Sequence, residues 1–540
     1  MRRNLGSIFS CLALISLILV VYLPITKTFY LQDEWLGYGL YLTKGTGMIL
    51  QSTGSLLGAI LGQGRILTNL LYFLFYQYSS LNIFPVAVFA ITLHIVNTLV
   101  VFLLAKRLFR NTLSAFLGSL FFAVNSVSQS AITWSAASVN TLPSTTLILI
   151  SLILYFKYLK SSRVRWIILS FVTVYLSLLF KETGVFMLLL LPLFSLVYKK
   201  QTTRDFIKTY WYYLASVFLI VAYRIWGFRS ESGDVALFLT GSSKYFYESL
   251  VVRSILYPLT SFSLSIVPPE LFLNFARYLT NVYYPFIPEA QFILIAQTVV
   301  LDVISIVLSG IIIFIIFMLL KITTPRVKKF VVMWLVFLFV SFLPYIIISK
   351  NFSYLESRYY YLASAVWGVI FAWVASLIAE KIKSKYIKAA FLIIFILFLY
   401  IHASIVIKDI NKLVGESQTR INILNQLSEI KPKLDGKKNV VLVTGDTDYY
   451  LPGNKVPFQQ GFGYTLMAVY YPSGNIPREF LKEGYLFDIG SQGIKESGEY
   501  AFGYFSNSKE LEVEIKRYKI QSDSVLRLYY NSKNGRLMQI

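Results

Sequence analysis

The chain begins with a hydrophobic segment and an acid pair: residues 7–23 read SIFSCLALISLILVVYL, and residues 28–35 follow as TFYLQDEW. The first stretch is apolar for nearly the ~20 residues that a helix needs to cross a bilayer. Two arginines precede it, and no small-residue cleavage site follows, so we expect a retained helix with a cytoplasmic N-terminus. Asp33 and Glu34 therefore emerge on the opposite face. There they are either a hydrated cap or part of a site.

The composition excludes a single soluble globule. Of 540 residues, 56% are hydrophobic, 17% aromatic and only 14% charged. The formal charge of +23 comes largely from lysines and arginines in short loops between apolar runs, which is the positive-inside pattern and not a nucleic-acid surface. These basic loops are residues 106–110, 157–165, 199–208, 321–329 and 381–388.

The alternation of apolar runs and basic loops predicts a mainly α, polytopic helical bundle with about eleven spans. The predicted spans lie near residues 7–26, 83–104, 113–125, 141–157, 166–181, 184–198, 209–226, 298–320, 330–348, 360–379 and 387–407. This topology predicts an integral protein, with the plasma membrane as its expected location. Everything after about residue 408 then lies outside the cytoplasm.

We expect three units: a membrane domain over residues 1–407, a helical connector over 408–430 and a small extracytoplasmic α+β domain over 431–540. Asn439–Gly445 has the pattern of a buried strand, and the alternating stretches Leu511–Tyr518 and Ser524–Tyr530 predict further strands. In the membrane domain, two outer regions exceed simple turns, residues 27–82 and 227–291, and the second is expected to hold a helix around Val251–Val267. The only cysteine, Cys11, lies in the first span, which excludes disulfides and cysteine-based metal sites.

Charged residues at the outer ends of spans are candidates for a site, because ionisable groups beside the membrane are functional by default. Lys181 and Glu182 occupy a turn between two apolar runs, where a self-paired, solvated turn is the plain alternative. Arg65 lies near the second span, where it could simply anchor at the interface.

Glu356 and Arg358 open the tenth predicted span, where they could pair with each other. His94 is expected to be a packing residue more often than a ligand. His402 is the only other histidine, so a two-histidine metal site is discounted.

All the candidate cations map to the same outer face as the acid pair. Arginine offers bidentate recognition of phosphate oxygens, and lysine supplies a point charge. A nearby aspartate can accept a proton from an acceptor hydroxyl as the phosphate departs. This set of groups suits the transfer of a sugar from a polyprenyl-phosphate carrier.

Several phrases occur along the chain in the order Asp33-Glu34, Gly64-Arg65, His94-Ile-Val-Asn97, Phe121-Phe-Ala-Val-Asn-Ser126, Ala131-Ile-Thr-Trp134, Phe180-Lys-Glu-Thr-Gly184 and Ser357-Arg-Tyr-Tyr-Tyr-Leu362. Taken in this order, they resemble the GT-C superfamily of integral-membrane glycosyltransferases, especially protein O-mannosyltransferases and tetratricopeptide-containing mannosyltransferases. The resemblance covers roughly residues 1–400 and leaves out the tail.

The resemblance implies a role for each matching residue. Asp33 would be the catalytic base for an inverting attack on the anomeric carbon, and Glu34 would orient it or bind the acceptor. The donor phosphate would be held by Lys181, Arg358 and Arg65. Supporting roles would fall to Glu182, His94 and Glu356.

Two departures from the family pattern limit this reading. Where relatives carry His-Pro and then a glutamate, this chain has Asn125-Ser126 and Ser130. The missing acid removes a second carboxylate, so no metal is expected to be obligatory, and a divalent metal is not supported. The tail also lacks tetratricopeptide periodicity.

Other readings stay open. Asp446-Thr-Asp448 could bind a metal and a nucleotide sugar, although an acidic turn after a strand is common. A transporter or flippase of lipid-linked sugars is the main non-enzyme alternative, and a membrane scaffold is another. The donor sugar is not specified by the sequence, and the acceptor could be a protein, a glycolipid or a cell-envelope polymer. Membrane lipids are the remaining expected partners, and nucleic acid is not one.

Overall fold

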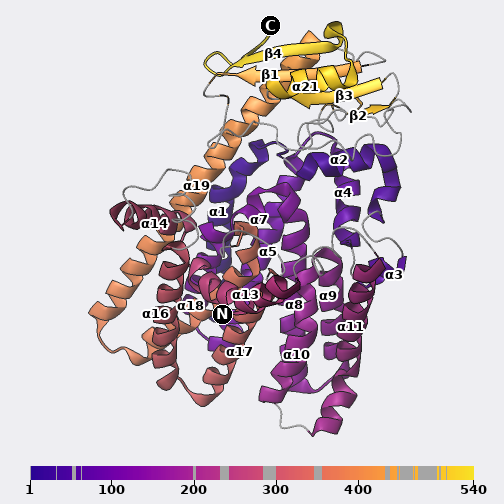
Figure 1. Ribbon diagram of the computed structural model, residues 1–540. Helices are drawn as coiled ribbons and strands as arrows, with labels where there is room; N and C mark the ends of the chain where they lie inside the picture. Colours follow the sequence, from indigo (N-terminus) through magenta and orange to yellow (C-terminus); the bar gives the residue numbers. More distant parts are fainter. Residues whose placement is uncertain are drawn as a thin grey trace.

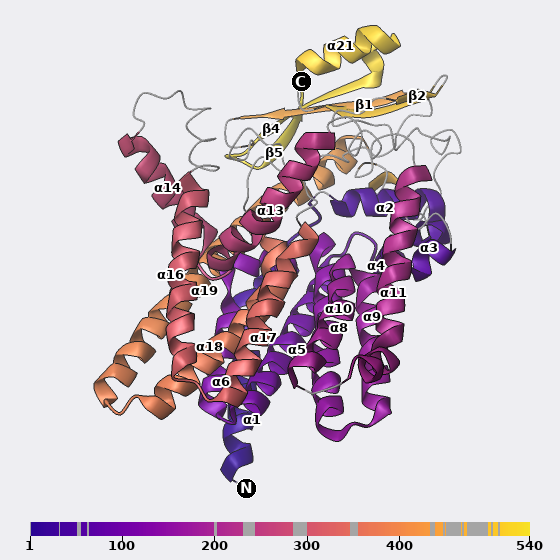
Figure 2. The ribbon, with the colours of Figure 1, turned by 60° about the horizontal axis from the view of Figure 1, so that its bottom comes forward.

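The structure, a computed structural model, shows a bundle of long helices with a small sheet at one end (Figure 1). In Figure 2 the start of the chain lies at the far end of the bundle from this sheet. The described residues are 2–31, 33–50, 56–61, 64–198, 202–230, 243–283, 300–345, 355–431, 438–446, 449, 466, 469–471, 495–497, 500–505 and 508–540.

Apolar helices build the bundle and define an integral membrane protein. Within the described ranges, eight helical segments are long and apolar enough to cross a membrane. Every predicted span overlaps a helix. Three of these helices, however, are shorter than the length needed to cross a bilayer, so the count of about eleven spans stays a prediction. The bundle helices are α1 (Arg2–Tyr22), α5 (Phe84–Phe109), α6 (Thr112–Val124), α8 (Ser135–Ser161), α9 (Val164–Phe180), α10 (Val185–Tyr198), α11 (Thr203–Ser230), α16 (Leu301–Lys321), α17 (Pro325–Phe342), α18 (Tyr361–Lys381) and α19 (Lys385–Ile430).

Two glycines let α6 and α18 approach closely in the middle of the bundle. A Cβ atom on Gly118 would lie 2.0 Å from the carbonyl oxygen of Gly368 and 2.9 Å from the Cβ of Ala372. Small residues at such contacts allow helix backbones to pack within van der Waals reach, which is how helices associate in a membrane. The bundle core therefore depends on the absence of a side chain at Gly118.

Short helices cover the end of the bundle that carries the sheet. They contribute to a second hydrophobic core around Trp35, Tyr38 and Tyr76, which also takes in Leu427 of α19 and Val441 of the sheet. The sheet thus packs on the first outer region. The short helices near this end are η1 (Leu23–Lys27), α2 (Asp33–Lys44), η2 (Gly45–Ile49), α3 (Leu56–Ile60), α4 (Ile66–Ser79), η4 (Ser126–Ser128), α7 (Ser130–Thr133), η5 (Glu182–Gly184), η7 (Leu343–Tyr345) and η8 (Ser357–Tyr360).

The second outer region contains α13 (Ser243–Leu264) and α14 (Pro269–Tyr283), so the predicted helix around Val251–Val267 is confirmed, with an earlier start. α19 runs without a break for 46 residues, about 70 Å at ~1.5 Å per residue, from the bundle to the sheet. The predicted last span and connector are therefore one helix. The boundaries of the three predicted units stay a prediction.

The C-terminal sheet has five strands in the order β2-β3-β1-β4-β5. β1 lies at its centre, parallel to β3 and β4, while β2 and β5 pair antiparallel at the edges. Val441 and Val443 of β1 face the core shared with α2, and Val440 and Leu442 face a third core on the other side. The strands are β1 (Lys438–Gly445), β2 (Lys495–Ser497), β3 (Tyr500–Phe505), β4 (Val525–Asn531) and β5 (Arg536–Gln539).

The strands predicted at 439–445 and 524–530 are confirmed as β1 and β4, but the strand predicted at 511–518 is wrong. That stretch belongs to the helix α21 (Ser508–Tyr518), which is followed by η10 (Ser522–Ser524). The alternation Leu511, Val513, Ile515 suggested a strand, but Val513 is 62% exposed, whereas Leu511 and Ile515 pack into the third core. Residues four apart share one face of a helix, and this spacing is the one that is buried.

Candidate functional site

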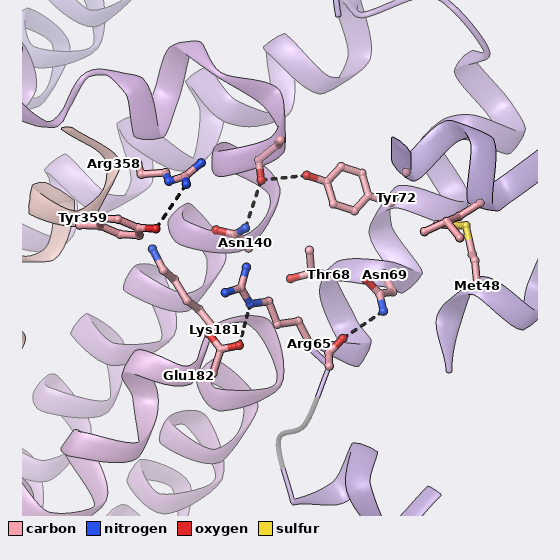
Figure 3. A pocket seen from close by; sticks show the side chains of 14 residues that line it. Met48, Arg65, Thr68, Asn69, Tyr72, Asn140, Lys181, Glu182, Arg358 and Tyr359 are labelled. Atoms are coloured by element: carbon pink, nitrogen blue, oxygen red, sulfur yellow. Dashed lines mark hydrogen bonds and ion pairs between the residues drawn. The ribbon is translucent and has the colours of Figure 1, made fainter. Parts of the chain in front are cut away.

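A cavity of about 480 Å³ is lined in part by α2 and α4, which lie at the end of the bundle that carries the sheet (Figure 1). Figure 3 shows the side chains that line it. Its walls come from α2, η2, α4 and α8, from the turn between α9 and α10, and from η8. Four of its lining residues are charged, and three of these are cations. The lining residues are Gly37, Leu40, Met48, Gly64, Arg65, Thr68, Asn69, Tyr72, Ala136, Asn140, Lys181, Glu182, Arg358 and Tyr359.

Lys181 is a buried cation in this cavity. It follows the last residue of α9 in an extended conformation, and its side chain is only 5% exposed. Its Nζ donates a hydrogen bond to Oγ1 of Thr141 at 2.9 Å and lies 5.4 Å from the centroid of the Tyr359 ring. Burial lowers the pKa of Lys181 to about 7; the charges of Arg65 and Arg358 act in the same direction, while Glu182 opposes them. The alternative of a solvated, self-paired turn is therefore wrong for Lys181.

Arg65 pairs with Glu182 across the cavity wall. The distance from Nε to Oε1 is 2.8 Å, and each side chain is partly exposed. The backbone of Arg65 is left-handed, with φ 53° and ψ 52°, directly before α4. Such a conformation is rare for a residue with a side chain, and strained residues of this kind gather at functional sites. The turn at Gly64-Arg65 thus holds the guanidinium group at the cavity.

Arg358 closes another side of the cavity. It forms an ion pair with Glu356 at 2.7 Å, as the mutual-pair alternative predicted. Its guanidinium carbon lies 4.3 Å from the centroid of the Trp134 ring, and one of its N–H groups donates to the Tyr359 hydroxyl at 3.3 Å. Stacking of this kind fixes the guanidinium plane and leaves further N–H groups for an anion.

Sequence reasoning missed the polar residues on α4 and α8 that complete the lining. Tyr72 and Asn140 both donate to the carbonyl oxygen of Ala136, at 2.8 and 3.1 Å. Asn69 donates to the Gly64 carbonyl oxygen at 3.0 Å, which braces the turn that carries Arg65. A possible signal was the amide side chain of Asn140, which directly precedes the predicted span 141–157.

The two members of the acid pair, Asp33 and Glu34, lie in different places relative to the cavity. Glu34 does not line the cavity: it is 2% exposed and accepts hydrogen bonds from Ser135 Oγ and from the Ala136 N–H, at 3.2 Å for the latter. It therefore caps the start of α8, where a carboxylate is stabilising. Asp33 is the first residue of α2, and its side chain lies outside the described part of the structure. Its backbone stands one helical turn before Gly37, which lines the cavity.

The two histidines lie inside the bundle. The Nδ1 of His94 hydrogen-bonds the Tyr361 hydroxyl at 2.8 Å, and its Nε2 lies 3.1 Å from the Ala123 carbonyl oxygen. His402 contacts the N–H and hydroxyl of Ser126. His94 thus packs as the commoner reading had it and does not line the cavity. Among the residues that the structure describes, no group of three or more His, Cys, Asp or Glu side chains could hold a metal ion.

Ser130 and the Asp-x-Asp phrase at residues 446–448 also bear on the predictions made from the sequence. Ser130, at the position where the pattern suggested by the resemblance has an acid, donates its backbone N–H to the Ser357 hydroxyl at 3.4 Å, beside the cavity residue Arg358. Residues 447 and 448 of the Asp-x-Asp phrase lie outside the described residues. Asp446 accepts hydrogen bonds from the backbone N–H groups of Tyr449 and Ser532.

The fold and the cavity together define a polytopic membrane protein with a cationic cavity at one end. No protein-family model matches the chain, and no curated protein matches it. One similar solved structure is the archaeal oligosaccharyltransferase AglB from Archaeoglobus fulgidus, in complex with an inhibitory peptide and a dolichol-phosphate. The identity is 11% and the TM-score 0.39, over 85% of this chain and 63% of that one. At this level of similarity, nothing is carried over from that protein.

Proposed function

We propose that the protein is a GT-C-like membrane glycosyltransferase, which moves a sugar from a polyprenyl-phosphate-linked donor to an acceptor on the extracytoplasmic face. The observation that carries this proposal is the excess of positive charge in the cavity. Arg65, Lys181 and Arg358 line it, whereas two carboxylates oppose them: Glu182 in the lining, and Glu356, which pairs with Arg358 from outside it. Charges of one sign that are held together out of water are unfavourable, and a bound phosphate relieves them.

The three cations would contribute to phosphate binding in different ways. The two guanidinium groups can each offer paired N–H donors to its oxygens, and Lys181 adds a point charge between them. Leu57 and Ile60 of α3, which precedes the turn at Arg65 in the chain, are apolar and exposed, and we propose that a polyprenyl tail lies against them. A phosphate with a hydrophobic tail therefore suits this position better than a soluble nucleotide sugar.

The proposed reaction needs one proton acceptor. The acceptor hydroxyl attacks the anomeric carbon, its proton passes to the carboxylate of Asp33, and the bond from that carbon to the phosphate oxygen breaks with its electron pair left on the phosphate. Attack opposite the leaving phosphate inverts the anomeric centre. The cations stabilise the negative charge that develops on the leaving group, so we infer that a divalent metal is not obligatory. The acceptor is a protein, a glycolipid or a cell-envelope polymer.

The test uses the purified full-length protein with a radiolabelled polyprenyl-phosphate hexose. We expect Asp33→Asn to bind the donor with normal affinity but to transfer no sugar, while Lys181→Met loses donor binding. Undiminished transfer by the Asp33 variant would show that the base is another group. In the alternative of a transporter or flippase, labelled donor would cross the membrane of vesicles with no release of polyprenyl phosphate.

A further inference from the structure

A second cavity of about 290 Å³ lies at the end of the bundle opposite the sheet. It is formed by the end of α5, the turn between α16 and α17, and the last turns of α18, which meet at the lower end of the bundle in Figure 2. Its apolar walls include Phe109, Phe330, Trp373 and Leu377. Nothing in the proposed glycosyl transfer uses this cavity.

The rim of the second cavity is basic. Arg107, Arg110, Arg326 and Lys381 surround it, and all four are exposed. Within the described ranges, none of these cations forms an ion pair. The single carboxylate of the lining, Glu380, accepts a hydrogen bond from the Ser376 hydroxyl at 3.0 Å. The rim therefore carries unneutralised positive charge.

An unused hydrogen-bond donor lies in the wall of the same cavity. The Trp373 side chain is 1% exposed, and its indole N–H has no acceptor in the described part of the chain. A buried donor without an acceptor is costly, so a bound group that accepted a hydrogen bond from this N–H would stabilise the site. This second observation is independent of the charges on the rim.

The surroundings favour an acyl-linked anion over a free one. Leu103 is 44% exposed and lies one turn before Arg107 on the same face of α5, and Ile322 beside the lining residue Thr323 is 52% exposed. Apolar side chains exposed on membrane-spanning helices face lipid. An acyl chain would therefore lie directly beside the basic rim.

We propose that this second cavity binds the headgroup of an anionic phospholipid. The arginines donate hydrogen bonds to the phosphate oxygens, and the acyl chains lie along Leu103 and the neighbouring apolar surface. Basic pockets between membrane helices commonly hold such headgroups. This inference is independent of the proposed sugar transfer, because the two cavities lie at opposite ends of the bundle.

The test is native mass spectrometry of the full-length protein in detergent, with added phosphatidylglycerol or phosphatidylcholine. We expect the wild type to retain phosphatidylglycerol selectively. The double variant Arg107→Gln/Arg326→Gln should lose affinity by about fivefold for each cation removed, the factor expected for basic residues near anionic lipid. The matched control Lys160→Gln/Arg163→Gln removes the same charge from another basic loop and should bind as the wild type does.

Trp373→Phe removes only the indole N–H and part of the ring, and it should weaken phosphatidylglycerol binding with the rim intact. If the Lys160/Arg163 control variant lost phosphatidylglycerol affinity to the same extent, the effect would come from overall charge. That result would contradict a specific site in the second cavity. Binding of inorganic phosphate, in competition with the lipid and with equal affinity, would show a phosphate site and not a lipid site. Unchanged lipid retention in the Arg107/Arg326 variant would also contradict the proposal.

Discussion

Arg65 and Glu182, 117 positions apart in the chain, form an ion pair with Nε and Oε1 2.8 Å apart. The pair joins the turn before α4 to the turn between α9 and α10, and both residues line the first cavity next to Lys181. Their charges act on Lys181 in opposite directions. A change of charge at either Arg65 or Glu182 should therefore change the pKa of Lys181.

Loss of Lys181 should abolish most of the donor recognition. Because Lys181→Met removes a buried charge from the phosphate, we expect kcat/KM to fall by about 100-fold or more, the scale seen when one stabilising donor is lost. The measurement is sugar transfer over a range of donor concentrations. The control is Lys160→Met, an exposed lysine in a basic loop, which should leave kcat/KM unchanged.

Donor affinity should depend on pH through Lys181. Below pH about 7 the free protein already carries the proton, so affinity should be flat; above it, binding must take up a proton and affinity should fall. Isothermal titration with a donor analogue measures this. An affinity that stays constant well above neutral pH would mean that Lys181 does not touch the phosphate.

The stability of the empty protein should change with pH in the opposite sense. The Lys181 pKa is about 7 in the folded protein against an ordinary value of 10.5, so between these values the unfolded chain holds the extra proton. Stability then rises with pH across this window, while the burial penalty is fully present below it. Thermal melting of the wild type and Lys181→Met at several pH values tests this, since the variant should lack this part of the rise.

The two members of the ion pair should shift the pH response in opposite directions. Arg65→Gln removes a charge that lowers the Lys181 pKa, so the fall in donor affinity should begin at a higher pH. Glu182→Gln removes the opposing charge, so the fall should begin at a lower pH. Stability should change little in Glu182→Gln, by less than ~1 kcal/mol, because the pair is partly exposed. Shifts in the same direction would contradict the coupling.

Gly118 should tolerate no side chain. Gly118→Ala places a Cβ 2.0 Å from the Gly368 carbonyl oxygen, so α6 and α18 must separate at a cost of about 1–3 kcal/mol or more. Gly310→Ala in α16 is the control, because nothing lies within 4 Å of its Cβ position. It should keep or raise the melting temperature, and an equal loss in both variants would show that the close helix contact is not the cause.

The sequence was informative where a residue's chemistry conflicts with its surroundings. Charges beside apolar runs marked Lys181, Arg65 and Arg358, and the structure brings all three to one cavity. Hydropathy predicted each bundle helix, since membrane spans are specified by composition.

The features that could not be predicted from the sequence depend on tertiary packing. Glu34 looked like a member of the site, but Ser135 and the start of α8, 101 positions away, occupy its carboxylate. The alternating residues 511–518 fit a strand equally well until the third core selected the helical face. Asn140 and Tyr72 join the cavity only through the way α4 meets α8, and neither residue alone predicts that contact.

The most direct measurement is a cryo-electron-microscopy map of the full-length protein with a bound polyprenyl-phosphate. We predict density for the phosphate within hydrogen-bonding distance of Lys181, between the guanidinium groups of Arg65 and Arg358 and within reach of Asp33. A phosphate bound elsewhere, with the cavity of Lys181 filled only by solvent, would contradict the proposed donor site.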